Sequence, residues 1–534
     1  MSRQSSTLIR GTLILTLAGI FAKIISAFYK VPLAYFTGTV GIGYYQNIYG
    51  LYSLLTAASL IGIPNSISKL VAEEIAKKQY RKAHDIFRYA FILTGAIGLF
   101  VSLVLVCFER TILRLNGWDD GSYYALLGMG LAPFFIAVAG AIRGYLQGMQ
   151  QMAPTAISQI IENLVKVIIG IGLVYILLEK GYGIPIAVGG AALGVSIGFV
   201  FSALFLLMTY MKQHKEIMLK VRTQESDEHF TSVVKKIGMI AIPITVASAA
   251  LSIMLAIDAA TLPRLLDTQI VMEGERIAEG TYINGILGKM QTIINVPLVL
   301  SVSLIISIVP TISAANTRKT KDELKKKIIE GIEIAVKLAL PAAFGIVILA
   351  EPILNFVYQK PEGYRYLQIM AIGLVFMILG QSMTGILQGL SKYYTALNIV
   401  LISGLVKLIL NVFFINIGLS GYGVTVATVI YYFLITVFSY INVKKCVHIK
   451  KDIFHTYGKP LIASSIMGGS VYMAYTFIHS LVHSNAVALL SSIFIGIIIY
   501  LLIMLLLKAF SEEELLLIPK GSRLVRWMEK KHII

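Results

Sequence analysis

Long apolar segments alternate with short polar segments along almost the whole chain, and this alternation predicts membrane-spanning helices. Runs of roughly twenty apolar residues, the length that crosses a hydrocarbon core of about 30 Å, recur from the first residues almost to the last. About fourteen such helices are predicted, and no remaining segment is long enough to form a large soluble domain. The expected fold is an all-α polytopic membrane protein.

The predicted spans are separated by short connections. They cover residues 9–36, 41–63, 88–108, 121–142, 153–178, 184–211, 237–263, 281–310, 331–357, 364–390, 395–417, 421–443, 459–481 and 486–508.

The charged residues between the spans indicate how the chain crosses the membrane. Only 14% of the residues are charged, against about 25% in soluble proteins. Most of the 46 lysine and arginine residues fall in alternate connections, which the positive-inside rule places in the cytoplasm together with both termini. Almost all of the net charge of +18 then faces the anionic lipids of the inner leaflet, so it does not require a nucleic-acid partner. The expected localisation is the cytoplasmic membrane.

One segment of the chain repeats after 241 residues. The 25 residues from Gly144 match those from Gly385 at nine positions, including Gln147 with Gln388 and Lys166 with Lys407. An even number of spans separates the two copies, so they share one orientation and form a parallel repeat.

The repeat predicts two lobes of six helices each. The expected parts are an N-terminal lobe (1–211), a cytoplasmic linker (212–236), a C-terminal lobe (237–443), and two additional helices with a basic cytoplasmic tail (444–534). The linker and the outer connection 264–280 are expected to be connectors or short interfacial helices.

Ionisable residues inside the spans are the main candidates for function. Each costs at least about 2.5–3.5 kcal/mol at the centre of a membrane helix, so each needs a partner, a hydrated cavity or access to the interface. The candidates are Lys23, Lys30, Glu162, Lys166, Asp258, Lys289, Lys337 and Lys407.

Lys23, Lys30 and Lys289 are candidate substrate-binding residues. Lys23 and Lys30 are seven residues apart, which places them on one helix face about two turns apart. Lys30 stands just before Pro32 and has snorkelling to the headgroups as an alternative. Lys289 lies among glycine and polar residues, which favours the wall of a polar cavity.

Glu162 and Lys166 are four residues apart, the spacing of a structural ion pair on one helix face. In the repeat, Lys407 takes the position of Lys166 but Ser403 replaces Glu162. Lys407 is therefore expected to be unpaired and to face a hydrated cavity or an anionic ligand. Asp258, near the outer end of its span, is a candidate for proton or cation coupling.

Sequence signals for enzyme chemistry are weak. The chain has no HExxH, P-loop, CxxC or GxSxG motif, and its eight histidines are scattered over loops and helix ends. We therefore expect no catalytic residues, no metal site and no cofactor. Cys107 and Cys446 are predicted to lie on opposite sides of the bilayer, so they cannot form a disulfide.

Three segments resemble one family of transporters. The stretch from Arg143 (RGYLQGMQQMAPTAISQIIENLVK), the segment from Leu8 (LIRGTLILTLAGIFAKI) and the segment from Ile63 (IPNSISKLVAEEIAKKQ) resemble polysaccharide-biosynthesis transporters of the multidrug/oligosaccharidyl-lipid/polysaccharide exporter superfamily. The resemblance is to the group of stage V sporulation protein B and the lipid II flippases, and it covers roughly residues 5–445.

The resemblance implies a flippase for an undecaprenyl-pyrophosphate-linked cell-wall precursor. Two lobes would enclose a cationic cavity that opens alternately to each side, and the family's basic residues would correspond to Lys23, Lys30 and Lys289. The chain differs from lipid II flippases in having lysine where arginine is usual, which supplies a point charge and no bidentate fork. The alternatives are a cation-coupled multidrug exporter and a non-transporting scaffold. Expected partners are the polyprenyl-pyrophosphate-linked glycan, membrane lipids and wall-synthesis enzymes.

Overall fold

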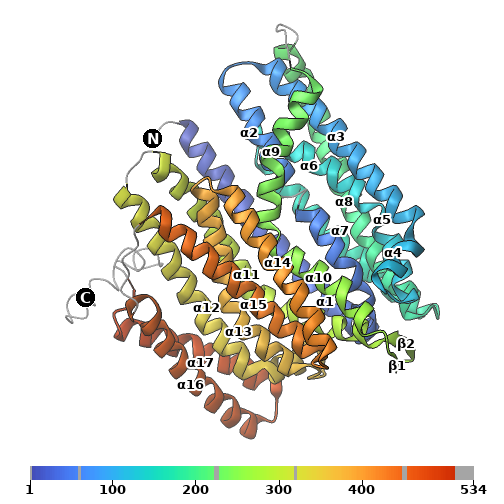
Figure 1. Ribbon diagram of the computed structural model, residues 1–534, viewed down its shortest axis with the longest axis vertical. Helices are drawn as coiled ribbons and strands as arrows, with labels where there is room; N and C mark the ends of the chain where they lie inside the picture. Colours follow the sequence, from blue (N-terminus) through green and yellow to red (C-terminus); the bar gives the residue numbers. More distant parts are fainter. Residues whose placement is uncertain (1–2, 58–61, 222–227, 318–320, 448–453, 511–534) are drawn as a thin grey trace. The chain divides into compact units, whose positions relative to one another are not determined.

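The computed structural model describes residues 3–57, 62–221, 228–317, 321–447 and 454–510. Almost all of this chain is helical (Figure 1). Eleven of its helical segments are long and apolar enough to cross a membrane, and many of their apolar side chains are exposed on the protein surface. Backbone groups that bond within helices and apolar side chains that face outward are the features that a bilayer requires. The protein is therefore a multi-pass membrane protein, as the sequence predicts.

The described chain forms two compact units. Unit 1 comprises residues 1–299 and 392–431, and unit 2 comprises residues 300–391 and 432–534. These units do not test the predicted division into lobes. The elements of unit 1 before its hairpin are α1 (Arg3–Ala57), α2 (Ile63–Ala76), α3 (Tyr80–Cys107), α4 (Glu109–Asn116), the 3₁₀ turn η2 (Asp120–Ser122), α5 (Tyr123–Gly130), α6 (Ala132–Gly148), α7 (Ala153–Glu179), α8 (Ile184–Val221), α9 (Phe230–Ser248) and α10 (Ala250–Leu265).

The later elements are shared between the units. Unit 1 also contains β1 (Gln269–Met272), β2 (Glu275–Ala278), the first part of α11 (Glu279–Thr317), α14 (Tyr393–Asn416) and the first part of α15 (Ser420–Cys446). Unit 2 contains the remainder of α11 and α15 with α12 (Lys321–Tyr358), α13 (Tyr364–Gly389), the short helix η3 (Phe454–Gly458), α16 (Lys459–Val482) and α17 (Asn485–Leu506).

Helix α1 is two helices that reverse direction at Gly38. Gly38 has φ 66° and ψ −163°, a conformation that is readily available only to glycine. A continuous helix would place Tyr29 and Tyr45 about 24 Å apart. Their ring centroids are instead 5.9 Å apart, so the two halves run antiparallel. The halves correspond to the first two predicted spans.

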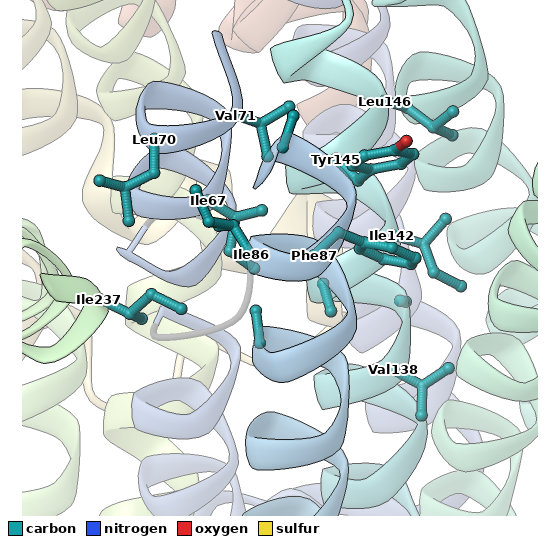
Figure 2. Close-up of a cluster of buried hydrophobic side chains, with 14 of the residues drawn as sticks. Ile67, Leu70, Val71, Ile86, Phe87, Val138, Ile142, Tyr145, Leu146 and Ile237 are labelled. Carbon is teal, nitrogen blue, oxygen red and sulfur yellow. The ribbon is translucent and has the colours of Figure 1, made fainter. Parts of the chain in front are cut away.

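An apolar core in unit 1 joins α2, α3, α6 and α9 (Figure 2). Ile67, Leu70 and Val71 occupy one face of α2 because positions three and four apart lie on the same side of a helix. Phe87 of α3 stacks on Tyr145 of α6 with ring centroids 4.3 Å apart. In unit 2, a second core joins α12, α16 and α17, which lie side by side.

The structure adds detail to one predicted connection and one predicted span. Residues 264–280 contain an antiparallel β-hairpin, because Glu273 and Gly274 both have positive φ and form the two-residue turn that a tight hairpin needs. The span predicted at 237–263 is two helices, α9 and α10, because the backbone of Ala249 leaves the helical conformation. Hydrophobicity continues through this position, so the sequence pattern does not reveal the break.

The predicted repeat is visible in the backbone. Helices α6 and α13 end at the equivalent glycines Gly148 and Gly389. Gln150 and Ser391, again 241 residues apart, have φ of 62° and 60°. The two sequence copies therefore form the same helix ending.

A candidate anion-binding site in unit 1

Lys30 lies on the first half of α1 and is buried against the second half. Its side chain is 7% exposed, its Nζ donates to Gln46 Oε1 at 2.8 Å, and it lies 4.2 Å from the centroid of the Tyr49 ring. Among the residues that the structure describes, no carboxylate forms an ion pair with Lys30. An amide oxygen and an aromatic face stabilise an ammonium group without neutralising it. The described partners of Lys30 therefore carry no negative charge.

Lys166 lies near the same group of aromatic side chains. Tyr29, Tyr45, Tyr49 and Tyr52 of α1 form a tyrosine cluster, in which neighbouring ring centroids are 5.6–5.9 Å apart. Lys166 of α7 lies 5.3 Å from the Tyr29 ring centroid and donates to Asn163 Oδ1 at 3.1 Å. The tyrosine cluster thus links Lys30 and Lys166, although they are far apart in the sequence.

Lys289 of α11 contacts α1 at Thr39, where the second half of α1 begins. It is 5% exposed and donates a hydrogen bond to Thr39 Oγ1. The helices approach closely here, since a side chain at Gly285 would meet the carbonyl oxygen of Thr39. Close packing of small residues is the usual way in which membrane helices bring their backbones together. Lys30 of α1 and Lys289 of α11 are therefore both buried.

The expectation that Lys407 is unpaired was wrong. Its Nζ lies 2.7 Å from Asp258 Oδ1, and both side chains are buried. Lys407 also donates to Thr428 Oγ1 at 2.9 Å, while Asn411 donates to both Asp258 and Thr261. The partner, Asp258, lies on α10. The sequence repeat aligns α14 with α7, so it gives no indication of this pair. The two charges neutralise each other, which weakens the case for Lys407 as a substrate ligand and for Asp258 as a coupling group.

Arg143 is a buried charged residue that was not among the candidates. It is 1% exposed, and its Nη2 donates to Glu162 Oε2 and Ser202 Oγ, each at 2.9 Å. Its Nε donates to Ser158 Oγ at 3.0 Å. Glu162 therefore has a charged partner other than Lys166. The sequence offered one signal for Arg143, because this residue begins a motif that resembles the transporter family. The predicted span ended at residue 142, so Arg143 was not counted inside the membrane, whereas α6 continues to Gly148.

One candidate substrate ligand, Lys23, is left. Its side chain lies outside the described residues, although its backbone is part of α1. The described residues contain no group of three or more histidine, cysteine or acidic side chains arranged to hold a metal ion. Two of the candidate cations, Lys30 and Lys166, border one aromatic cluster, and Lys289 of α11 contacts the start of the second half of α1 at Thr39. Such an arrangement suits binding of an anion more than covalent chemistry.

Comparison with known proteins agrees with this architecture. Residues 8–316 match the family described as polysaccharide biosynthesis protein, and residues 285–413 match the MatE family. Stage V sporulation protein B of Bacillus subtilis (strain 168) is 26% identical over 532 residues, covering 98% of this chain and 100% of that protein. Lipid II flippase MurJ of the same organism is 26% identical over 460 residues, covering 83% of each chain.

Solved structures show the same fold. Lipid II flippase MurJ in an inward closed conformation aligns with a TM-score of 0.68 at 17% identity, covering 92% of this chain and 98% of that chain. An inward-facing multidrug resistance MATE family transporter of the MOP superfamily aligns with a TM-score of 0.63 at 13% identity, covering 78% and 94% of the two chains.

Proposed function

Because the chain belongs to the polysaccharide biosynthesis protein family, we propose that it moves an undecaprenyl-pyrophosphate-linked cell-wall precursor from the inner to the outer leaflet. Its relatives and structural neighbours make it a membrane transporter of the multidrug/oligosaccharidyl-lipid/polysaccharide exporter superfamily. The precursor is lipid II-like or another polysaccharide precursor, and it crosses by alternating access. The lipid-linked glycan is the partner of the transport site, and both termini face the cytoplasm.

The observation that carries this proposal is the buried ammonium group of Lys30. It has only neutral partners among the described residues, so its charge remains uncompensated inside a membrane protein. Burying such a charge is unfavourable unless an anion or water approaches it. A pyrophosphate group supplies that anion, and charge-assisted contacts to phosphate are about twice as strong as neutral hydrogen bonds. Lys289 and Lys23 are proposed to contribute to the same recognition.

The ion pairs of the buried acidic residues give less support to a role as a cation-coupled multidrug exporter. The two acidic candidates for binding or coupling a cation, Glu162 and Asp258, form ion pairs with Arg143 and Lys407. Neither carboxylate is therefore an uncompensated negative charge that attracts a cationic drug. The superfamily's relatives are transporters and flippases, so an enzymatic role has no support from them.

Depletion of the protein distinguishes transport from a scaffold role. In cells that depend on this chain, its loss should cause the lipid-linked precursor to accumulate in the inner leaflet, because synthesis continues while movement stops. Expression of Lys30→Arg should restore part of the growth, and Lys30→Met at equal abundance should not. Full rescue by Lys30→Met, or depletion without precursor accumulation, would contradict the proposal.

A further inference from the structure

Helix α11 carries a row of amide side chains and one glycine along a single face. The members of this row are Asn284, Gly288, Gln291 and Asn295. They follow one another at intervals of three or four residues, which places them on the same side of a helix. The first member has a structural role, because Asn284 Nδ2 donates to Asn47 Oδ1 of α1 at 2.9 Å. The row therefore begins as a contact between α11 and α1.

The middle of the row lies beside the contact between Lys30 and Gln46. A Cβ atom at Gly288 would lie 3.1 Å from Gln46 Oε1, the atom that accepts a hydrogen bond from Lys30 Nζ at 2.8 Å. Gln291 is three residues farther along α11, about 4.5 Å along the helix axis. This step is comparable with the size of one sugar ring. A ligand whose diphosphate contacts Lys30 can therefore bring the sugar attached to that diphosphate to Gln291.

The far end of the row has hydrogen-bonding groups that the described residues leave unused. Gln291 is 1% exposed, and its Nε2 donates to Asn295 Oδ1 at 2.7 Å. Its Oε1 is buried and accepts no hydrogen bond from the described part of the chain. Within the same residues, the Nδ2 group of the half-buried Asn295 donates none. Reversing both amides would still leave one acceptor and one donor. A buried acceptor without a partner is unfavourable, so this pair of amides needs a ligand or water.

One acceptor and one donor side by side match the polar groups of a sugar. A hydroxyl group both donates and accepts, and an acetamido group carries one N–H and one C=O. An ionised phosphate has no proton to donate to Gln291, and a hydrocarbon chain has no polar group at all. We propose that Gln291 and Asn295 bind the sugar attached to the diphosphate, and that this contact selects glycan-bearing lipids over sugar-free polyprenyl diphosphates. This inference rests on the proposed function.

Equilibrium binding to the purified full-length protein in nanodiscs measures the contribution of the sugar. The two probes are farnesyl diphosphate esterified to N-acetylglucosamine and farnesyl diphosphate esterified to a methyl group, so that both carry the same charge. The wild type should bind the sugar-bearing probe about tenfold more tightly than the methyl ester, equivalent to about 1.4 kcal/mol. Gln291→Leu should bind the two probes about equally, because leucine neither donates nor accepts a hydrogen bond.

Three further variants separate the sugar contact from other effects. Gln269→Leu makes the same change at an exposed glutamine of β1 and should keep the wild-type preference for the sugar-bearing probe. Lys30→Met should weaken the binding of both probes by a similar factor, because both contain the diphosphate. Asn295→Leu should reduce the preference for the sugar and serves as the second test if Gln291→Leu is unstable. Thermal unfolding of each variant shows whether it is folded.

Several outcomes would overturn the inference. These are equal binding of the two probes by the wild type, an unchanged preference in both Gln291→Leu and Asn295→Leu, equal weakening of both probes by Gln291→Leu, or an equal loss of preference in Gln269→Leu. Binding is measured without transport. A protein whose sugar preference depends on Gln291 but that moves no lipid-linked glycan would contradict the proposed function and leave the sugar site in place. A protein that moves the glycan without this dependence would contradict the sugar site alone.

Discussion

At the residue scale, the sequence indicated several of the buried charged side chains but not how they pair. Lys30 and Lys289 were identified because few charges interrupt apolar spans, and both are buried. The Asp258–Lys407 pair joins α10 to α14, which are far apart in the sequence, and no local spacing connects them. Arg143 was overlooked because hydrophobicity falls before α6 ends. Helical periodicity describes one helix at a time, whereas ion pairs between helices depend on tertiary packing.

The Asp258–Lys407 pair gives a prediction about stability. Lys407→Met leaves a buried carboxylate without its cation, and breaking such a pair from one side costs about 3–5 kcal/mol. The folded fraction and thermal unfolding temperature should fall in Lys407→Met and recover in the double variant Asp258→Asn/Lys407→Met, in which no charge is left unpaired. If the double variant is less stable than Lys407→Met, the ion pair does not have this structural role.

At the element scale, local glycine and turn chemistry explain both what was predicted and what was missed. The repeat from Gly144 and Gly385 predicted equivalent helices, and both end at the matching glycine with the same backbone turn. The hairpin was missed because its turn is Glu273–Gly274, and asparagine or aspartate is more usual before the glycine. The break at Ala249 has no local signal. Apolar patterns therefore predict that helices exist more reliably than they predict where helices break.

At the scale of the whole molecule, the multi-pass helical fold followed from composition and span length, while the orientation in the membrane remains a prediction from the lysine and arginine distribution. The described residues include both cysteines of the chain, which are free and exposed. Cys107 ends α3 on the predicted outer side, and Cys446 ends α15 on the predicted inner side. The native protein thus carries one reporter for each side.

Labelling of these cysteines tests the orientation. A membrane-impermeant maleimide added to intact cells should label Cys107 in the Cys446→Ser variant and should not label Cys446 in the Cys107→Ser variant. Permeabilised cells provide the control, because both variants should then react. Labelling of Cys446 in intact cells would reverse the topology and place the β1–β2 hairpin in the cytoplasm.

The central claim is that this chain by itself moves a diphosphate-linked lipid across a bilayer with the help of Lys30. The direct measurement is transbilayer movement of a fluorescent polyprenyl-diphosphate-linked glycan in proteoliposomes that contain only the purified protein. We expect wild-type protein to accelerate this movement over empty liposomes, and Lys30→Met to reduce it by about tenfold or more, since a lost charge-assisted contact costs about 1.5–3 kcal/mol. Lys180→Met, which changes an exposed lysine at the end of α7, should match the wild type. Movement no faster than in empty liposomes, or wild-type rates in Lys30→Met, would contradict the account.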